Sequence, residues 1–141
     1  MSAEAEIRGL VAAWTKAAHA KDVDAIMALY APEIVTFDLA PPLQHKADDI
    51  RKGLKEWFAT FRGPVEFAVR DLTVTTSGDA AFCHSLNHLT GDRTGGERTD
   101  VWVRATICFE RIKGAWKVVH EHISVPFYMD GSYRASVDLK P

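Results

Sequence analysis

Several ionisable side chains stand within apolar stretches of this sequence, where burial would tune them for proton transfer. Asp38 follows an apolar run, His84 and His88 alternate with apolar residues, and Glu121 lies in a β-rich stretch near the carboxyl end. A carboxylate beside a histidine in an apolar pocket can exchange protons near neutral pH, because burial and pairing shift both pKa values toward neutrality. Asp38 and His84 are our candidates for acid–base chemistry, and His88 and Glu121 are candidate ligand-binding residues.

Each candidate also has a purely structural interpretation. Asp38 can cap the following turn through backbone amides, as aspartate commonly does, and His84 can be a hydrogen-bonded histidine of a pocket wall. His120 and His122 can share one face of a strand and bind a metal ion together. Because His84 and His88 are expected on the opposite face, further ligands are missing, and we predict no metal site.

Length and composition favour one domain over residues 1–141. Of these 141 residues, 47% are hydrophobic and 26% are charged, as in a typical globular protein. The formal net charge of −2 creates no field that would attract nucleic acid or an anionic membrane. Two cysteines make no disulfide framework, and residues 1–10 resemble neither a signal peptide nor a membrane span, so we expect a cytoplasmic protein. The sequence has no glycine-rich phosphate loop, and we expect no cofactor.

Three helices are expected in the first half of the chain. Apolar residues recur at helical spacing over residues 7–21 and again over 46–61, where Gly63 and Pro64 end the pattern. Between them Asp22 can cap a short helix whose apolar face closes at Tyr30 and which Pro32 ends. A brief strand over 34–38 then runs into a proline-rich loop.

After Pro64 the hydrophobic period changes to two, which predicts four strands. These cover residues 65–76, 79–90, 97–111 and 115–127, with glycine-containing turns between them. Strands this long must twist and bend, so we expect an α+β fold in which a strongly curved, mainly antiparallel sheet wraps around the three helices. The core spans about 5–127, and the polar tail 128–141 should lie on the surface or against a partner subunit.

Alternation along the strands assigns their faces. On the third of these strands the core face is predicted to carry Val101, Val103, Ala105, Ile107 and Phe109. On the second strand the bulkier set is predicted to face the helices, namely Phe82, His84, Leu86 and His88. On the last strand we place Val119, Glu121 and Ile123 inside, opposite Trp116 and Val118.

A family resemblance rests on the order and spacing of several segments. They are Trp14, residues 21–26 leading to Tyr30 and Ala31, the strand end Phe37-Asp38, and residues 116–124. From about residue 7 to 127 the chain resembles the nuclear-transport-factor-2-like superfamily, which includes ketosteroid isomerases and SnoaL-like cyclases. The resemblance implies a cone-shaped, cystatin-like fold, similar to that of ketosteroid isomerase, with an open apolar pocket. Its expected lining is Trp14, Tyr30, Trp57, Phe61, Phe82 and Leu86.

The resemblance also implies roles for the ionisable residues. Asp38 falls where ketosteroid isomerases keep the aspartate that moves a proton, so it would be the general base, with His84 as its acid or orienting partner. In those isomerases the surroundings of each carboxyl group tune its pKa to its role. His88 and Glu121 would line the pocket. We therefore expect a protein that binds a small apolar molecule and acts as a cofactor-independent isomerase, cyclase or dehydratase.

A different class of function is also compatible with the sequence. The stretch 119–122 with Ser124 resembles the association domain of calcium/calmodulin-dependent kinases, in which this fold serves to oligomerise. For the leading function too we expect a homodimer, paired through the outer sheet face that is expected to carry Trp102, Arg104, His120 and His122. A non-catalytic ligand-binding or oligomerisation module is thus the alternative.

Overall fold

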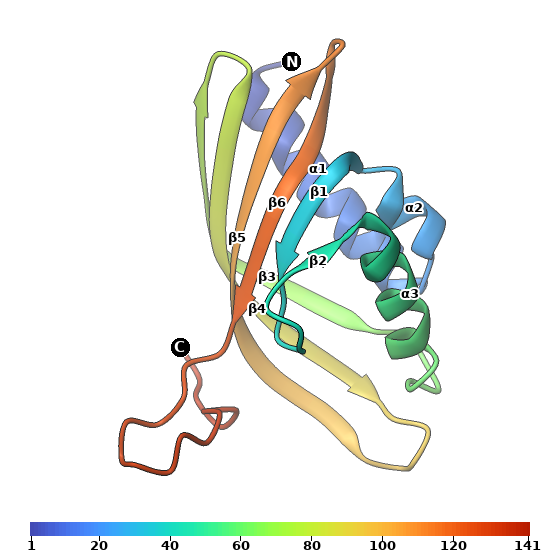
Figure 1. Cartoon of the computed structure of the whole chain (residues 1–141), viewed down its shortest axis with the longest axis vertical. Helices are drawn as coiled ribbons and strands as arrows, with labels where there is room; N and C mark the ends of the chain where they lie inside the picture. Colours follow the sequence, from blue (N-terminus) through green and yellow to red (C-terminus); the bar gives the residue numbers. More distant parts are fainter.

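The computed structural model describes residues 1–141 and contains the predicted mixture of helices and strands (Figure 1). Its helices are α1 (Ala3–His19), α2 (Val23–Met27) and α3 (Ala47–Phe58). Its strands are β1 (Tyr30–Phe37), β2 (His45–Lys46), β3 (Glu66–Ser77), β4 (Ala80–Asp92), β5 (Arg98–Ile112) and β6 (Ala115–Ser124). None of the helices is both long and apolar enough to span a membrane.

The strands form one six-stranded sheet in the order β2-β1-β6-β5-β4-β3. All neighbouring pairs are antiparallel except β1 and β6, which run parallel. The sheet curls, and the three helices lie on its concave side (Figure 1). The α+β prediction, with a strongly curved and mainly antiparallel sheet, is therefore confirmed.

Side-chain caps fix where the first two helices begin. The Ser2 hydroxyl accepts a hydrogen bond from the Ala5 amide at 3.1 Å, and the Asp22 carboxylate accepts one from the Ala25 amide at 3.0 Å. Such caps satisfy amides that have no partner inside the helix. The predicted cap at Asp22 is correct, and the first helix begins four residues earlier than its apolar pattern indicates.

The short second helix ends sooner than predicted. It stops at Met27, so Tyr30 opens β1 instead of closing a helical face, and Pro32 lies within that strand. The pairing of β1 with β6 shifts register between Tyr30 and Val35. A proline has no amide hydrogen for the ladder, and such an irregularity accommodates it.

Two irregularities bend the long strands. In β3 the register with β4 shifts between Arg70 and Thr73, and Asp71 there adopts a φ of 56°. In β6 the register with β5 shifts so that Cys108 pairs with His120 while Phe109 pairs with Val118. Extra residues of this kind increase the local twist of a strand, which helps the sheet to curl around the helices.

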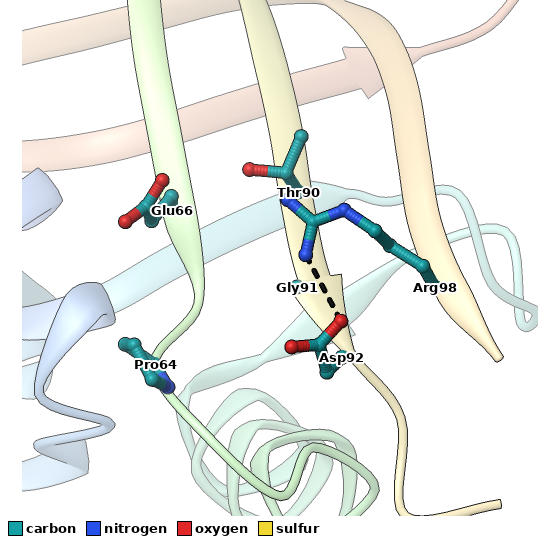
Figure 2. Close-up of a pocket in the computed structure, with 6 residues that line it drawn as sticks. All are labelled: Pro64, Glu66, Thr90, Gly91, Asp92 and Arg98. Carbon is teal, nitrogen blue, oxygen red and sulfur yellow. Dashed lines mark hydrogen bonds and ion pairs between the residues drawn. The ribbon is translucent and has the colours of Figure 1, made fainter. Parts of the chain in front are cut away.

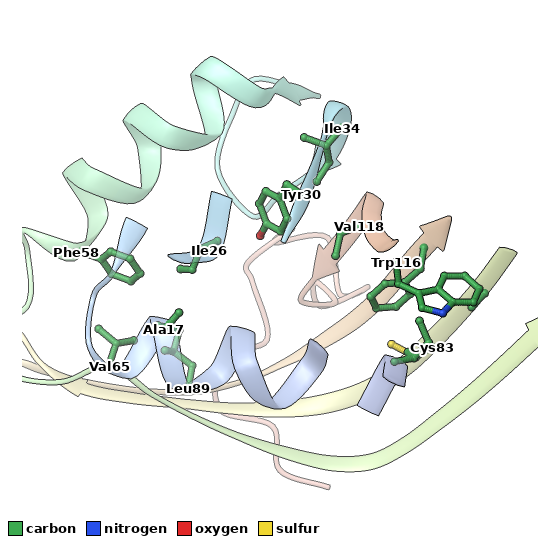
Figure 3. Close-up of a cluster of buried hydrophobic side chains, with 14 of the residues drawn as sticks. Ala17, Ile26, Tyr30, Ile34, Phe58, Val65, Cys83, Leu89, Trp116 and Val118 are labelled. Carbon is green, nitrogen blue, oxygen red and sulfur yellow. The ribbon is translucent and has the colours of Figure 1, made fainter. Parts of the chain in front are cut away.

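The hydrophobic core lies between the helices and the concave sheet face (Figure 3). Helix α1 supplies Ile7 and Ala18, α2 supplies Ile26, and the sheet supplies Phe109 and Val118, all 4% exposed or less. Packing this layer fixes the direction in which each strand presents its side chains, and so determines which polar groups reach the interior.

The tail after β6 leaves the body of the domain as a closed loop (Figure 1). The Tyr128 amide donates to the Arg134 carbonyl at 2.8 Å, and the Ser136 amide donates to the Pro126 carbonyl at 2.8 Å. The Tyr128 hydroxyl also donates to Asp138. Most apolar side chains of the tail remain exposed, including Met129 and Tyr133.

Candidate functional site

An extra residue in β6 decides which side chains of that strand reach the interior. Because Val119 has no partner in the β5 register, the strand switches face there. Trp116 and Val118, predicted outside, are buried, whereas Glu121 is buried as predicted with 9% of its surface exposed. Strict alternation failed at this point because it cannot accommodate an unpaired residue.

Glu121 is the end of a buried chain of hydrogen bonds that crosses the concave side. The Trp14 indole Nε1 donates to the Tyr30 hydroxyl at 2.8 Å, and this hydroxyl donates to Glu121 Oε1 at 2.9 Å. Helix α1, strand β1 and strand β6 each supply one member. The three side chains are thus held together by donors and acceptors that each satisfy the next.

Burial tunes the acid of this chain. Removal of the carboxyl from water raises the pKa of Glu121 from 4.5 to about 7, the Tyr30 hydrogen bond opposes this shift, and the negative charge of Asp38 adds to it. Burial likewise raises the pKa of the Tyr30 phenol well above its usual value, so this hydroxyl stays protonated. Glu121 can therefore gain or lose a proton near neutral pH.

Glu121 also keeps one oxygen free. Its Oε1 accepts from Tyr30, while no protein group bonds to its Oε2. The only fully enclosed side-chain polar atom without a partner is Nε1 of Trp116, so Glu121 Oε2 retains an opening to its surroundings. A molecule beside it could exchange a proton or a hydrogen bond with this oxygen.

Asp38 stands at the edge of the same side of the sheet. It follows β1 directly, after the buried Thr36 and after Phe37, whose ring contacts His120 at 4.7 Å and His122 at 5.4 Å between ring centroids. Phe37 therefore faces outward, and alternation turns Asp38 inward, where its charge acts on Glu121. Its carboxylate accepts a hydrogen bond from the Leu39 amide at 2.6 Å, which matches the turn-capping interpretation, and the residue is exposed.

The prediction for the faces of β4 is wrong. Cys83 and Leu89 are buried on the concave side, whereas Phe82 is 46% exposed on the other face, which Leu86 also shares. His84 is exposed on that outer face too, so it does not meet Asp38 in the interior. The concave side of β4 carries the small Cys83 and Ser85 beside the larger Leu89, so side-chain size does not identify the inner face of this strand.

His88 is likewise on the outer face. Its ring stacks on Trp102 with 4.6 Å between centroids, and its Nε2 lies 2.6 Å from Asp100 Oδ1. These contacts place His88 in a surface cluster with Trp102, away from the predicted pocket lining. No group of three histidine, cysteine or acidic side chains is arranged to hold a metal ion.

Of the aromatic residues predicted to line a pocket, Trp14, Trp57 and Phe61 are joined by Phe67, which sequence reasoning missed, whereas Phe82 lies on the outer face. Phe67 on β3 lies 4.9 Å from Trp14 and 6.2 Å from Trp57 between ring centroids, and Trp57 lies 5.1 Å from Phe61. Trp14, Trp57 and Phe67 are only partly buried. Apolar surface therefore remains available on the concave side.

Two further polar groups face the concave side without having been predicted. Ser85 is buried and its hydroxyl lies 2.8 Å from Asn87 Oδ1. Their position follows from the same alternation that places Cys83 and Leu89 inside. Correct assignment of the β4 face would have identified both.

A small polar hollow of about 150 Å³ lies at the start of β3 (Figure 2). Arg98 crosses it and pairs with Asp92 at 3.0 Å, and Glu66 and Thr90 complete the wall. Its arginine and aspartate pair with each other, and Pro64 is the only apolar side chain in its lining.

Comparison with known proteins agrees with this architecture. The model of the SnoaL-like domain matches residues 7–128, and the search of curated proteins found no match. An NTF2-like protein of unknown function from Pseudomonas putida KT2440 is 36% identical, with a TM-score of 0.87, over 100% of this chain and 99% of that chain.

More distant structures share the fold. A candidate dehydratase of the NTF2-like family from Streptomyces avermitilis is 16% identical, with a TM-score of 0.76, over 86% of this chain and 94% of its own. A candidate calcium/calmodulin-dependent protein kinase II association domain from Xanthomonas campestris is 20% identical, with a TM-score of 0.77, over 88% of both chains. Other matching structures are described as having a cystatin-like fold.

Proposed function

The chain belongs to the SnoaL-like domain family, and we propose that it binds a small hydrophobic ligand on the concave face of its sheet and moves a proton on that ligand without a cofactor. The observation that carries the proposal is the buried Glu121 carboxyl, whose pKa of about 7 suits proton transfer at neutral pH.

The ligand class follows from the surface beside Glu121. Trp14, which is linked to Glu121 through Tyr30, packs against Phe67, which contacts Trp57, and all three are incompletely buried. Covering this surface would remove apolar area from water, at a gain of about 25 cal/mol per Å². The polar groups within reach are few, so the ligand would be mainly apolar with one or two oxygen atoms.

The proton transfer divides between two carboxyl groups. Asp38, at the exposed rim, is the proposed base that takes a proton from a carbon next to a carbonyl group of the ligand. Glu121, protonated on its free oxygen Oε2, would donate a hydrogen bond from that oxygen to the carbonyl oxygen of the ligand as negative charge develops there. Tyr30 and Trp14 support this role, because their hydrogen bonds hold Glu121 in place. In this scheme Glu121 takes the role of acid partner to Asp38 that the sequence analysis gave to His84.

The test is exchange of carbon-bound hydrogen. A series of cyclic ketones, beginning with cyclohexanone and 1-tetralone, would be screened for binding by tryptophan fluorescence, and bound ketones followed by NMR in D2O. Asp38→Asn should slow enzyme-dependent deuterium uptake at least about 100-fold, and binding should persist. Glu33→Gln, which changes an exposed carboxylate of the preceding strand β1, is the matched control and should leave the rate unchanged.

A non-catalytic binding or oligomerisation module is the second candidate function. It is favoured by the likeness in fold to the candidate kinase II association domain. Ketone binding without any deuterium uptake above the buffer rate would select this function and exclude the proton transfer.

We also propose that the chain forms a homodimer through the outer sheet face that carries Trp102, Arg104, His120 and His122. Trp102 keeps part of its large surface exposed beside His88, and a partly exposed tryptophan is a typical anchor of protein interfaces.

A further inference from the structure

The outer sheet face carries a hollow of about 300 Å³ that plays no part in the proposed proton transfer. It lies over β3, β4 and β5, on the side opposite Glu121, and it includes Arg104 of the face proposed above for the homodimer, so the two proposals are alternatives for that residue. Its lining combines hydroxyl, imidazole and guanidinium groups with a single large apolar side chain, and comprises Asp71, Thr73, His84, Ser85, Leu86, Arg104, Ala105 and Thr106.

The register of the strands explains why these groups meet. Thr73 pairs with His84, and His84 pairs with Thr106, so the three stand in one row across the face. Leu86 and Arg104 pair in the next row. The side chains of Ser85 and Ala105 are buried on the concave side, so their backbone forms the floor of the hollow.

Arg104 is held in place and still has donors to spare. Its Nε donates to Ser124 Oγ at 3.0 Å, which restricts the guanidinium, while its two Nη groups have no partner in the protein. The imidazole of His84 and the hydroxyls of Thr73 and Thr106 line the same hollow. An oriented guanidinium with free Nη groups matches the two oxygens of a carboxylate.

The charges around the hollow favour a single negative group. Asp71 contributes a negative charge, but Arg70 Nε lies 3.6 Å from its Oδ2 and offsets it. Arg104 then remains as the one uncompensated fixed charge of the lining. A monoanion fits this balance better than a doubly charged phosphate, which would need more than one cation.

We propose that this hollow binds a small monocarboxylate. Arg104 receives the carboxylate group through its Nη atoms, the hydroxyls of Thr73 and Thr106 and the ring of His84 supply further hydrogen bonds, and Leu86 packs against a short apolar chain. The hollow is at the lower end of the range of about 300–1,000 Å³ for small-molecule sites, so the ligand has only a few carbon atoms.

The test is an NMR titration of the whole protein with sodium butyrate, at constant ionic strength, with neutral butyramide as the matched probe. Butyrate should shift the backbone amides of Thr73, His84 and Thr106, and butyramide should not. Arg104→Gln should weaken butyrate binding about tenfold, a loss of about 1.4 kcal/mol, while Arg98→Gln, which lines the other hollow, should leave it unchanged.

Three results would overturn the proposal: no shift in these amides, equal shifts with butyramide, or an equal effect of the two arginine substitutions. The result is independent of the proton-transfer proposal. Glu121→Gln should abolish the contribution of Glu121 to deuterium uptake by the ketone, and it should leave the butyrate titration unchanged. The spectrum of each variant also reports whether it is folded.

Discussion

Tyr30 and Glu121 are 91 residues apart in the chain and share a buried hydrogen bond of 2.9 Å. Each comes from a strand next to the other in the sheet, and Trp14 extends the contact to helix α1 by donating to the same tyrosine hydroxyl. The bond ties the last strand to the first half of the chain, and it lowers the pKa of the one carboxyl buried in the interior, against the larger opposite effect of burial.

Tyr30→Phe should therefore destabilise the protein by about 1–3 kcal/mol, because it leaves a buried carboxyl and an indole donor without a partner. Urea unfolding would measure this change in the free energy of unfolding. Tyr133→Phe is the matched control, since Tyr133 is 73% exposed in the tail and should leave stability unchanged. Equal effects of the two substitutions would contradict the buried hydrogen-bond chain.

Glu121 should make stability depend on pH in a defined interval. The folded protein keeps its proton up to about pH 7, whereas the ordinary pKa of this carboxyl is 4.5. Between these values the folded state binds more protons than the unfolded state, so the free energy of unfolding should fall as pH rises, by on the order of 3 kcal/mol in full. Above the folded pKa this contribution becomes constant.

Glu121→Gln tests this dependence because glutamine stays neutral at every pH. The difference in stability between the variant and the parent, measured by urea unfolding, should change across the interval and level off on either side. A constant difference from pH 4 to pH 8 would show that burial does not raise the pKa of Glu121.

Asp38→Asn should lower the pKa of Glu121, since the negative charge of Asp38 is one cause that raises it. The carboxyl carbon signal of Glu121, followed by NMR against pH, reports this directly. Glu33→Gln removes a charge from the preceding strand β1 and should change the pKa of Glu121 less. A pKa that is the same in both variants would place Asp38 too far from Glu121 for the two carboxyl groups to act on one ligand.

Most elements of the fold were predictable from sequence because their signals are local, whereas the two-residue strand β2 was not predicted. Helical spacing identified α1 and α3, Asp22 marked the start of α2, and the change to a period of two marked the four long strands. The faces of β4 were not predictable in this way, because both sets of alternating residues contain apolar types. Size favoured Phe82 and Leu86 as the inner set, but the set that is buried is the one with Cys83, Ser85 and Leu89.

The candidate site could be predicted only in part, for a related reason. Trp14, Tyr30 and Glu121 were all expected in the interior, and each one is there at least in part. Their hydrogen bonds depend on the extra residue Val119 and on the early end of α2, which bring distant strands into register. Such irregularities arise from tertiary packing and leave no periodic signal in the sequence.

Trp102→Glu should convert a dimer into a monomer if the outer face joins two copies. A buried charge at the centre of an interface is costly, because it loses its water without gaining a partner. Sedimentation equilibrium would give the mass of each variant over a range of concentrations. Leu43→Glu, at a loop position that is 95% exposed, is the matched control and should leave the mass unchanged. A parent protein that stays monomeric at every concentration would refute the dimer.

Gly91→Ala should destabilise the fold, because the ring of Phe61 occupies the space that a side chain would need. An added Cβ would stand 2.7 Å from two carbons of that ring. Phe61 cannot move aside freely, since Trp57 packs against it and the Arg93 guanidinium lies 4.0 Å from its centroid. Overpacking of this kind costs about 1–3 kcal/mol.

Gly53→Ala is the matched control for this substitution. Gly53 lies within α3, is exposed, and has nothing within 4 Å of an added Cβ, so alanine there should raise the free energy of unfolding by about 0.5–1 kcal/mol through its greater helix propensity. If Phe61 packs directly on β4, urea unfolding should show changes of opposite sign in the free energy of unfolding of the two variants. Stabilisation by both would mean that the aromatic cluster beside the proposed ligand surface is more loosely packed than the contacts of Phe61 require.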